Sequence, residues 1–274
     1  MASTTATKSH PYHMVNPSPW PATGSIAALS LAIGGIWFMH GGPAWAIAPG
    51  FAILFATFFF WWRDVVRESR AGDHTEAVNH GLRVGFLLFI ASEVMFFVAF
   101  FWAYFNASVP LINRAAHDIW PPEGVIPFYA WGLPFLNTLI LLTSGATVTI
   151  AHHAVRLGHR DKLVFWTGAT AVLGVLFLCL QAYEYSHAAF GFRDGIYSST
   201  FFMATGFHGF HVFVGTCFLF VCFFRARAGD FTPEKHVGFE AAAWYWHFVD
   251  VVWLFLFVCI YWLGGLGFTG QYSH

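Results

Sequence analysis

Several polar side chains that can transfer protons or bind metals lie inside long apolar runs of this 274-residue sequence. Glu93 stands alone in the run IASEVMFF at 90–97. Three later runs each carry polar residues three or four positions apart, a spacing that shares one helix face. These residues are Gln181, Glu184 and His187; Thr205, His208 and His211; and Glu240, Trp244, His247 and Asp250. A charged group at the centre of a bilayer is costly unless it is paired or neutralised, so these residues need partners.

Three kinds of chemistry fit these residues. Imidazoles on facing helices can ligate haem, with His208 or His211 opposite His247 as a candidate pair. A row of neighbouring acids and imidazoles can relay protons. Alternatively, they can form structural hydrogen bonds that fix the register of neighbouring helices. We predict that the polar faces turn toward one another and toward Glu93, and that Glu93 is either protonated or hydrogen-bonded to a histidine of the sixth helix.

The composition indicates that these side chains are positioned by membrane-spanning helices. Hydrophobic residues make up 57% of the chain and charged residues only 10%, whereas soluble domains carry about 25% charged residues. A helix needs about 20 apolar residues to cross the hydrocarbon, and a helix pairs all of its own backbone groups. The sequence predicts an all-α transmembrane protein with seven helices, at 23–39, 45–62, 84–105, 133–151, 163–190, 200–224 and 241–263.

The distribution of positive charge predicts the orientation. Seven spans place the two ends of the chain on opposite sides, and eleven of the 13 Lys and Arg residues then fall on the side of the N-terminus. Lys and Arg are enriched in cytoplasmic loops, so we expect a cytoplasmic N-terminus and a periplasmic C-terminus. We call the side of the membrane on which the N-terminus lies the basic side. The net charge of -1 provides no basic field for nucleic acid.

The predicted spans divide the chain into five parts. An N-terminal segment at 1–22 precedes a hairpin of two helices at 23–62, a charged linker at 63–80, a five-helix bundle at 81–265 and a tail at 266–274. Thr75 can cap the third helix. The sequence Thr232-Pro233-Glu234 predicts the start of the seventh helix, because Pro is favoured at the first helical position.

Two surface patterns have both a functional and an ordinary interpretation. Eight of the 15 His fall on the basic side: His10, His13, His74, His80, His152, His153, His159 and His236. Imidazole titrates near pH 6.5, so such an array can collect protons, although interfacial imidazoles are also common surface residues. Trp62 and Arg225 end the second and sixth helices on that side. Together they fit a lipid headgroup site, although each can also simply extend toward the headgroups.

Six segments carry a resemblance to a known family. The chain resembles subunit III of the haem–copper cytochrome c oxidases over nearly its whole length. The segments are HMVNPSPWP (13–21), WWRDV (61–65), SEV (92–94), WPP (120–122), ATGFHG (204–209) and GFEAAAWYWHFVDVVW (238–253). The last segment is long and specific.

The resemblance implies a fold and a set of roles. The first two helices would splay from helices three to seven to form a V-shaped cleft that holds phospholipid. Trp62, Glu68, His74 and Arg225 would line its headgroup site, although Arg227 and Asp230 depart from the animal members in that corner. The chain would carry no catalytic residue and no metal, since haem and copper would belong to partner subunits. The buried polar network would comprise Glu93, His208, His211, His247 and Asp250.

The expected function is that of a non-redox core subunit of cytochrome c oxidase. It would bind structural phospholipid, aid proton uptake and stabilise subunit I, with subunits I and II as partners and cytochrome c as the substrate of the complex. A stand-alone channel or transporter is the contrasting class. The composition, which leans toward Ala, Gly and Arg, favours the plasma membrane of an aerobic bacterium over the mitochondrial inner membrane.

Overall fold

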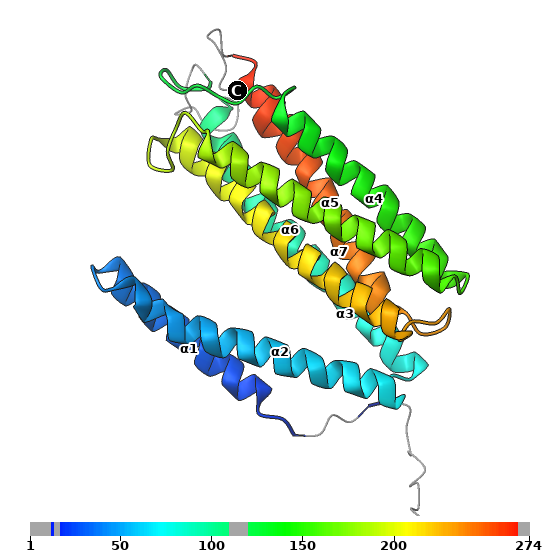
Figure 1. The fold of residues 1–274 in the computed structure, drawn as a ribbon. Helices are drawn as coiled ribbons and strands as arrows, with labels where there is room; N and C mark the ends of the chain where they lie inside the picture. Colours follow the sequence, from blue (N-terminus) through cyan, green and yellow to red (C-terminus); the bar gives the residue numbers. More distant parts are fainter. Residues whose placement is uncertain (1–11, 14–16, 110–119, 268–274) are drawn as a thin grey trace, which may run out of the picture. The chain divides into compact units, whose positions relative to one another are not determined.

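Seven long helices make up the protein in a computed structural model that describes residues 12–13, 17–109 and 120–267 (Figure 1). All seven are long and apolar enough to cross a membrane, which confirms the prediction of seven transmembrane helices. They are α1 Trp20–Met39, α2 Ala48–Ala71, α3 Glu76–Ser108, α4 Leu133–Arg156, α5 Arg160–Ser186, α6 Ile196–Ala228 and α7 Val237–Leu256. A short 3-10 turn, η1 Ala44–Ile47, precedes α2, and α7 continues through a π-helix, η2 Phe257–Trp262, into α8 Leu263–Gly265.

The chain forms two compact units, Met1–Leu82 and Arg83–His274, and each is described here by itself. In the first unit, α1 and α2 lie side by side as an antiparallel hairpin. The Trp20 indole donates a hydrogen bond to Asp64 Oδ2 at 2.8 Å. A Cβ on Gly34 would overlap the Ala46 carbonyl oxygen, so only glycine lets α1 approach η1 so closely.

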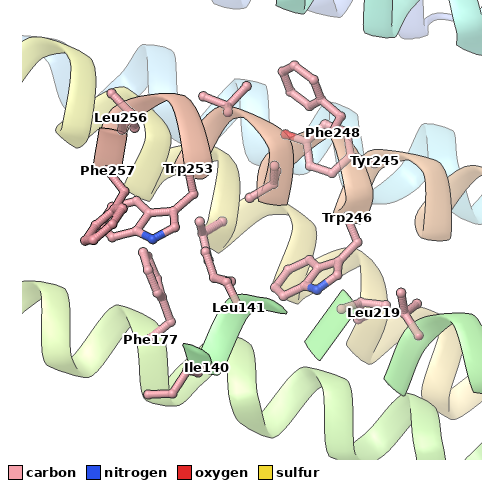
Figure 2. Close-up of a cluster of buried hydrophobic side chains, with 14 of the residues drawn as sticks. Ile140, Leu141, Phe177, Leu219, Tyr245, Trp246, Phe248, Trp253, Leu256 and Phe257 are labelled. Carbon is pink, nitrogen blue, oxygen red and sulfur yellow. The ribbon is translucent and has the colours of Figure 1, made fainter. Parts of the chain in front are cut away.

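In the second unit, α4 packs beside α5 and α7, while α6 packs beside α5 and α7. Figure 2 shows Trp246 and Trp253 of α7 among buried side chains from the neighbouring helices. Their indole N–H groups donate to Ser144 Oγ at 2.8 Å and to Thr138 Oγ1 at 2.9 Å, both on α4. These two hydrogen bonds fix the register of α4 against α7, because a buried indole N–H needs a partner.

Aromatic side chains join α3 to the rest of the second unit. The ring of Phe96 lies 5.1 Å from that of Phe207 on α6, and Phe97 lies 5.9 Å from Phe248 on α7. Nearer the basic side, the ring of Phe86 lies 6.5 Å from that of Phe218 on α6. These rings fill the space between the helices.

Most helix boundaries differ from the predicted ones by a few residues, and the end of α2 and the starts of α3 and α7 are the most informative. α2 continues through Ala71, so only 72–75 lies between α2 and α3, because charged residues continue a helix readily in the headgroup layer. The prediction that α7 starts at Thr232 is wrong: α7 starts at Val237. Thr232 and Lys235 instead exchange backbone hydrogen bonds of 3.1–3.2 Å that close a turn. Thr75 accepts a hydrogen bond from the Val78 N–H at 3.4 Å, as expected of a cap.

Candidate functional site

The hydrogen bond between Glu93 and His211 joins the middle of α3 to α6. Glu93 Oε2 lies 2.9 Å from His211 Nε2, and the Phe207 carbonyl lies 2.6 Å from His211 Nδ1. The histidine side chain is 9% exposed and the carboxyl 23%. This confirms the prediction that Glu93 is either protonated or bonded to a histidine of the sixth helix.

The geometry of the Glu93–His211 pair shows which of its atoms carry hydrogens. A carbonyl oxygen only accepts, so His211 Nδ1 carries a hydrogen and donates it to Phe207. A neutral His211 then accepts at Nε2 from a protonated Glu93, and a charged His211 donates at Nε2 to a carboxylate. In both forms a single exchangeable proton lies between Glu93 Oε2 and His211 Nε2, so the pair can hold a proton inside the membrane.

Aromatic rings surround the Glu93–His211 pair. Phe97 and Phe96 of α3 lie 4.9 and 5.8 Å from the imidazole, measured between ring centroids. Phe248 and Tyr245 of α7 lie 6.2 and 6.4 Å away. A hydrogen bond in such an apolar surrounding is electrostatically stronger than one in water.

His208, one turn before His211, faces α7 instead of Glu93. Its side chain is fully buried, and its Nε2 lies 3.1 Å from the Val249 carbonyl oxygen. The centre of its ring lies 5.1 Å from that of Trp253 and 5.8 Å from that of Phe177. Figure 2 shows these two aromatic residues. Because the carbonyl only accepts, Nε2 is the protonated nitrogen. The His208 side chain therefore joins α6 to the backbone of α7 by a hydrogen bond.

A second buried carboxyl lies between α5 and the end of α7. The Tyr261 hydroxyl donates to Glu184 Oε1 at 2.6 Å, and Gln181 Nε2 donates to the same oxygen at 3.1 Å. All three side chains are at most 4% exposed. Tyr261 was missed as a site residue, because it lies in the π-helical stretch of α7, out of step with the helical spacing of the other polar residues.

The prediction that the polar faces all converge on Glu93 is wrong. Of these polar residues, as far as the structure describes the chain, only His211 is hydrogen-bonded to Glu93, while Glu184 bonds Tyr261 and His187 lies exposed beside Ser186. His247 and Asp250 turn toward α4, with His247 Nε2 3.2 Å from Thr149 Oγ1. The physical reason is that two residues three positions apart point about 60° away from each other around the helix axis, which is enough for His208 and His211 to face different helices.

Glu240 forms an ion pair that the sequence reasoning did not assign. The Arg83 guanidinium of α3 donates to Glu240 Oε2 of α7 at 2.7 Å. The two residues are 157 positions apart, so no local spacing could reveal the pair. It joins α3 to the start of α7, and with Glu93–His211 it gives α3 two directional contacts to the bundle.

Three of the four predicted lipid-site residues lie in the first unit. Trp62 lines an apolar hollow of about 350 Å³ whose other lining residues are Gly24, Leu54, Thr57, Phe58, Trp61 and Val65. Glu68 lies 3.6 Å from His13, and the ring of His74 lies 6.4 Å from that of His13. This places an apolar hollow and polar groups along the basic-side half of the hairpin, an arrangement that suits an amphipathic ligand.

Arg225, the fourth predicted lipid-site residue, belongs to the second unit. Its Nε donates to Asp230 Oδ2 at 3.2 Å, and its guanidinium lies 4.6 Å from the centre of the Phe231 ring. The side chain is 17% exposed. An anion at Arg225 would have to share the guanidinium with Asp230.

The described residues also bear on metal binding. Within 12–13, 17–109 and 120–267, no group of three or more His, Cys, Asp or Glu side chains lies in an arrangement that could hold a metal ion. His10 and His274 lie outside the described residues.

Seven transmembrane helices with paired acids and imidazoles between them define a polytopic α-helical membrane protein. A sequence model of cytochrome c oxidase subunit III matches residues 10–265. Cytochrome c oxidase subunit 3 of the plant Marchantia polymorpha is 56% identical over 93% of this chain and 97% of its own length. The proteins of that name from Arabidopsis thaliana and Tragelaphus oryx are 55% and 50% identical, each over 94% of this chain and 98% of their own lengths. The chain belongs to the cytochrome c oxidase subunit III family.

The relatives correct the predicted location. Plants and a mammal are eukaryotes, whose cytochrome c oxidase lies in the mitochondrial inner membrane. The prediction of a bacterial plasma membrane is therefore wrong, and the relatives point to the mitochondrial inner membrane. The high content of Ala, Gly and Arg was a poor guide to the location of the protein, because many membrane proteins share this composition.

The Tyr261 hydroxyl should stabilise the protein through Glu184. We expect Tyr261→Phe to lower the free energy of unfolding by about 1–3 kcal/mol, because it removes a donor from a buried carboxyl whose Oε2 has no hydrogen-bond partner among the described residues. Tyr183→Phe on α5 is the matched control, since Tyr183 is 57% exposed. Thermal unfolding in detergent measures both changes, and equal stability of the two variants would contradict the assignment.

Proposed function

We propose that this chain is a non-redox core subunit of cytochrome c oxidase. In this role it supports the reduction of oxygen to water by cytochrome c, coupled to proton pumping, while the haem and copper centres belong to partner subunits. It holds structural phospholipid, aids proton uptake and stabilises subunit I. The observation that carries the proposal is the internal hydrogen bonding of the buried imidazoles: both nitrogens of His211 and Nε2 of His208 bind this chain's own groups.

The polar groups nearer the basic side support the role in proton uptake. The rings of His152 on α4 and His236, just before α7, lie 5.9 Å apart. Glu240 follows His236 by one helical turn and pairs with Arg83. Imidazole rings this close together and a nearby carboxylate provide several groups that can accept or donate a proton.

The hollow beside Trp62 supports the role in lipid binding. Its lining is largely apolar and includes Leu54, Phe58 and Trp62, so it suits a lipid acyl chain. Arg63 and Arg67 lie on the same helix toward the basic side and can contact phosphate. A phospholipid bound there would place its tail against the tryptophan and its phosphate near the arginines.

Replacing Glu93 should leave electron transfer intact. We expect Glu93→Gln to preserve the steady-state rate of cytochrome c oxidation and the haem absorbance of the purified oxidase. The amide keeps the shape of the carboxyl and can still donate to His211. Loss of the haem absorbance in this variant would contradict the proposal that the redox centres lie outside this chain.

Replacing Trp62 should release phospholipid. We expect Trp62→Ala to lower the lipid phosphorus retained per oxidase after detergent washing, because the variant loses apolar contact area in the hollow. Trp45→Ala is the matched control, since Trp45 is also an exposed tryptophan of the first unit and does not line the hollow. An unchanged phosphorus content in Trp62→Ala would contradict the lipid site.

A further inference from the structure

A groove of about 750 Å³ lies between α5 and α6 on the basic side, where α5 begins and α6 ends. The two helices pack side by side within the second unit (Figure 1). Arg160 and Asp161 of α5 and Arg227 of α6 form the polar end of the groove, and apolar residues form its floor. We call it the α5–α6 groove. It shares no lining residue with the hollow beside Trp62.

Small residues leave the floor of the groove open. The floor consists of Val164, Phe165, Gly168 and Ala169 of α5 and Phe223 of α6. A Cβ on Gly168 would lie 3.0 Å from Cε2 of Phe223, so the glycine lets this ring pack directly on α5. Phe165 is 65% exposed, so the floor can be reached from the surrounding bilayer. An acyl chain that lies on this floor gains van der Waals contact with both rings.

Arg160 keeps unused donors after it bonds the end of α6. Its Nε donates to the Ala226 carbonyl at 3.3 Å, and its Nη2 donates to the Arg227 carbonyl. Among the described residues these are its hydrogen bonds, and a guanidinium has five N–H groups, so three remain for a ligand. The two bonds already hold the side chain at the polar end of the groove, which reduces the entropy lost when an anion binds.

Arg227 brings a second, unpaired positive charge to the groove. Its guanidinium carbon lies 5.9 Å from the centre of the Phe223 ring, a contact that keeps the charge beside the floor. Within residues 12–13, 17–109 and 120–267 its side chain has no hydrogen bond and no ion pair. Two arginines and one aspartate give the polar end a net charge of +1, which one singly charged phosphodiester neutralises.

The polar end and the floor lie at the depths at which a phospholipid presents its two parts. α6 ends at Ala228 and α5 begins at Arg160, so both arginines lie in the headgroup layer. Ala169 follows Arg160 by nine residues, so the floor extends roughly 14 Å along α5 toward the hydrocarbon. Free phosphate would use the arginines and leave the floor uncovered, whereas an apolar chain alone would leave the arginines without an anion.

We propose that the α5–α6 groove binds a phospholipid, with the phosphate on Arg160 and Arg227 and one acyl chain along the floor. Guanidinium groups bind phosphate oxygens through pairs of N–H groups, which gives the headgroup a defined position. The inference extends the proposed lipid-binding role to a second site. It rests on the proposed function because the assembled oxidase is the preparation in which it is tested.

A photoactivatable phosphatidylglycerol with a diazirine in one acyl chain tests the proposal. It is titrated into purified, detergent-washed oxidase, and after illumination mass spectrometry measures the crosslinked fraction of the peptide that contains residues 164–169. We expect this fraction to saturate. Arg227→Gln should raise the half-saturating lipid concentration about tenfold or more, because it removes charge-assisted hydrogen bonds. Arg156→Gln is the matched control, since Arg156 is an exposed arginine of the basic side that does not line the groove.

Three results of this titration would overturn the proposal. The first is a crosslinked fraction that rises in proportion to the lipid without saturating, since bulk lipid behaves in this way. The second is an equal shift in Arg227→Gln and Arg156→Gln, which would indicate a general effect of surface charge. The third is the absence of any crosslink to residues 164–169, which would show that something else covers the groove.

Two further measurements distinguish a phospholipid from a free anion. Ala169→Leu fills the floor and should raise the half-saturating concentration about fivefold or more, whereas Ala146→Leu on an exposed part of α4 should not change it. Inorganic phosphate at the concentration of the lipid should leave the crosslink unchanged. Competition by phosphate, or an unchanged Ala169→Leu, would overturn the proposal. If Ala169→Leu does not assemble, Arg227→Gln decides, because its side chain bonds no described residue.

The two proposals fail differently. If the chain is not an oxidase subunit, it will not co-purify with the haem-containing complex, and the absorbance of the preparation shows this before any crosslinking. If the chain is a subunit but the groove binds no phospholipid, the haem absorbance is present and residues 164–169 are not saturably crosslinked. Trp62→Ala should not change the half-saturating concentration, because Trp62 does not line the groove.

Discussion

The hydrogen bond between Glu93 and His211 is the interaction on which the arrangement of the bundle most depends. It lies where hydrocarbon offers neither a donor nor an acceptor, so each partner needs the other helix. Aromatic rings of α3 add further contacts to α6 and α7 near this hydrogen bond. The Glu93–His211 hydrogen bond, the Arg83–Glu240 ion pair and the hydrogen bond that Trp120 donates to the Tyr104 hydroxyl are directional contacts of α3.

The same constraint explains the other polar groups between the helices. Trp246 and Trp253 bond hydroxyls of α4, His208 bonds the backbone of α7, and Tyr261 bonds Glu184. These contacts join α7 and its π-helical continuation to α4, α6 and α5 at several positions along the helix, so the bundle has several fixed points instead of one continuous polar chain. Asp250 stands apart because its buried Oδ1 has no hydrogen-bond partner among the described residues.

The sequence could predict the features that depend on local pattern. Apolar run length gave seven helices, and the isolation of Glu93 among apolar residues indicated a partner on the sixth helix. Features that depend on packing could not be predicted in this way. Tyr261 meets Glu184 across 77 positions of sequence and lies where α7 leaves the regular helical repeat. The turn at Thr232 also escaped prediction, because its reciprocal backbone bonds use no residue type that distinguishes it from a helix start.

The central claim is that Glu93 and His211 stabilise the protein together and not as two separate polar residues. A double-mutant cycle of Glu93→Leu and His211→Leu, measured by the free energy of unfolding in detergent, tests it most directly. The account predicts a coupling energy of about 1–3 kcal/mol between the two substitutions. Effects that add to within about 0.5 kcal/mol would show that the two side chains act independently, and would contradict the account.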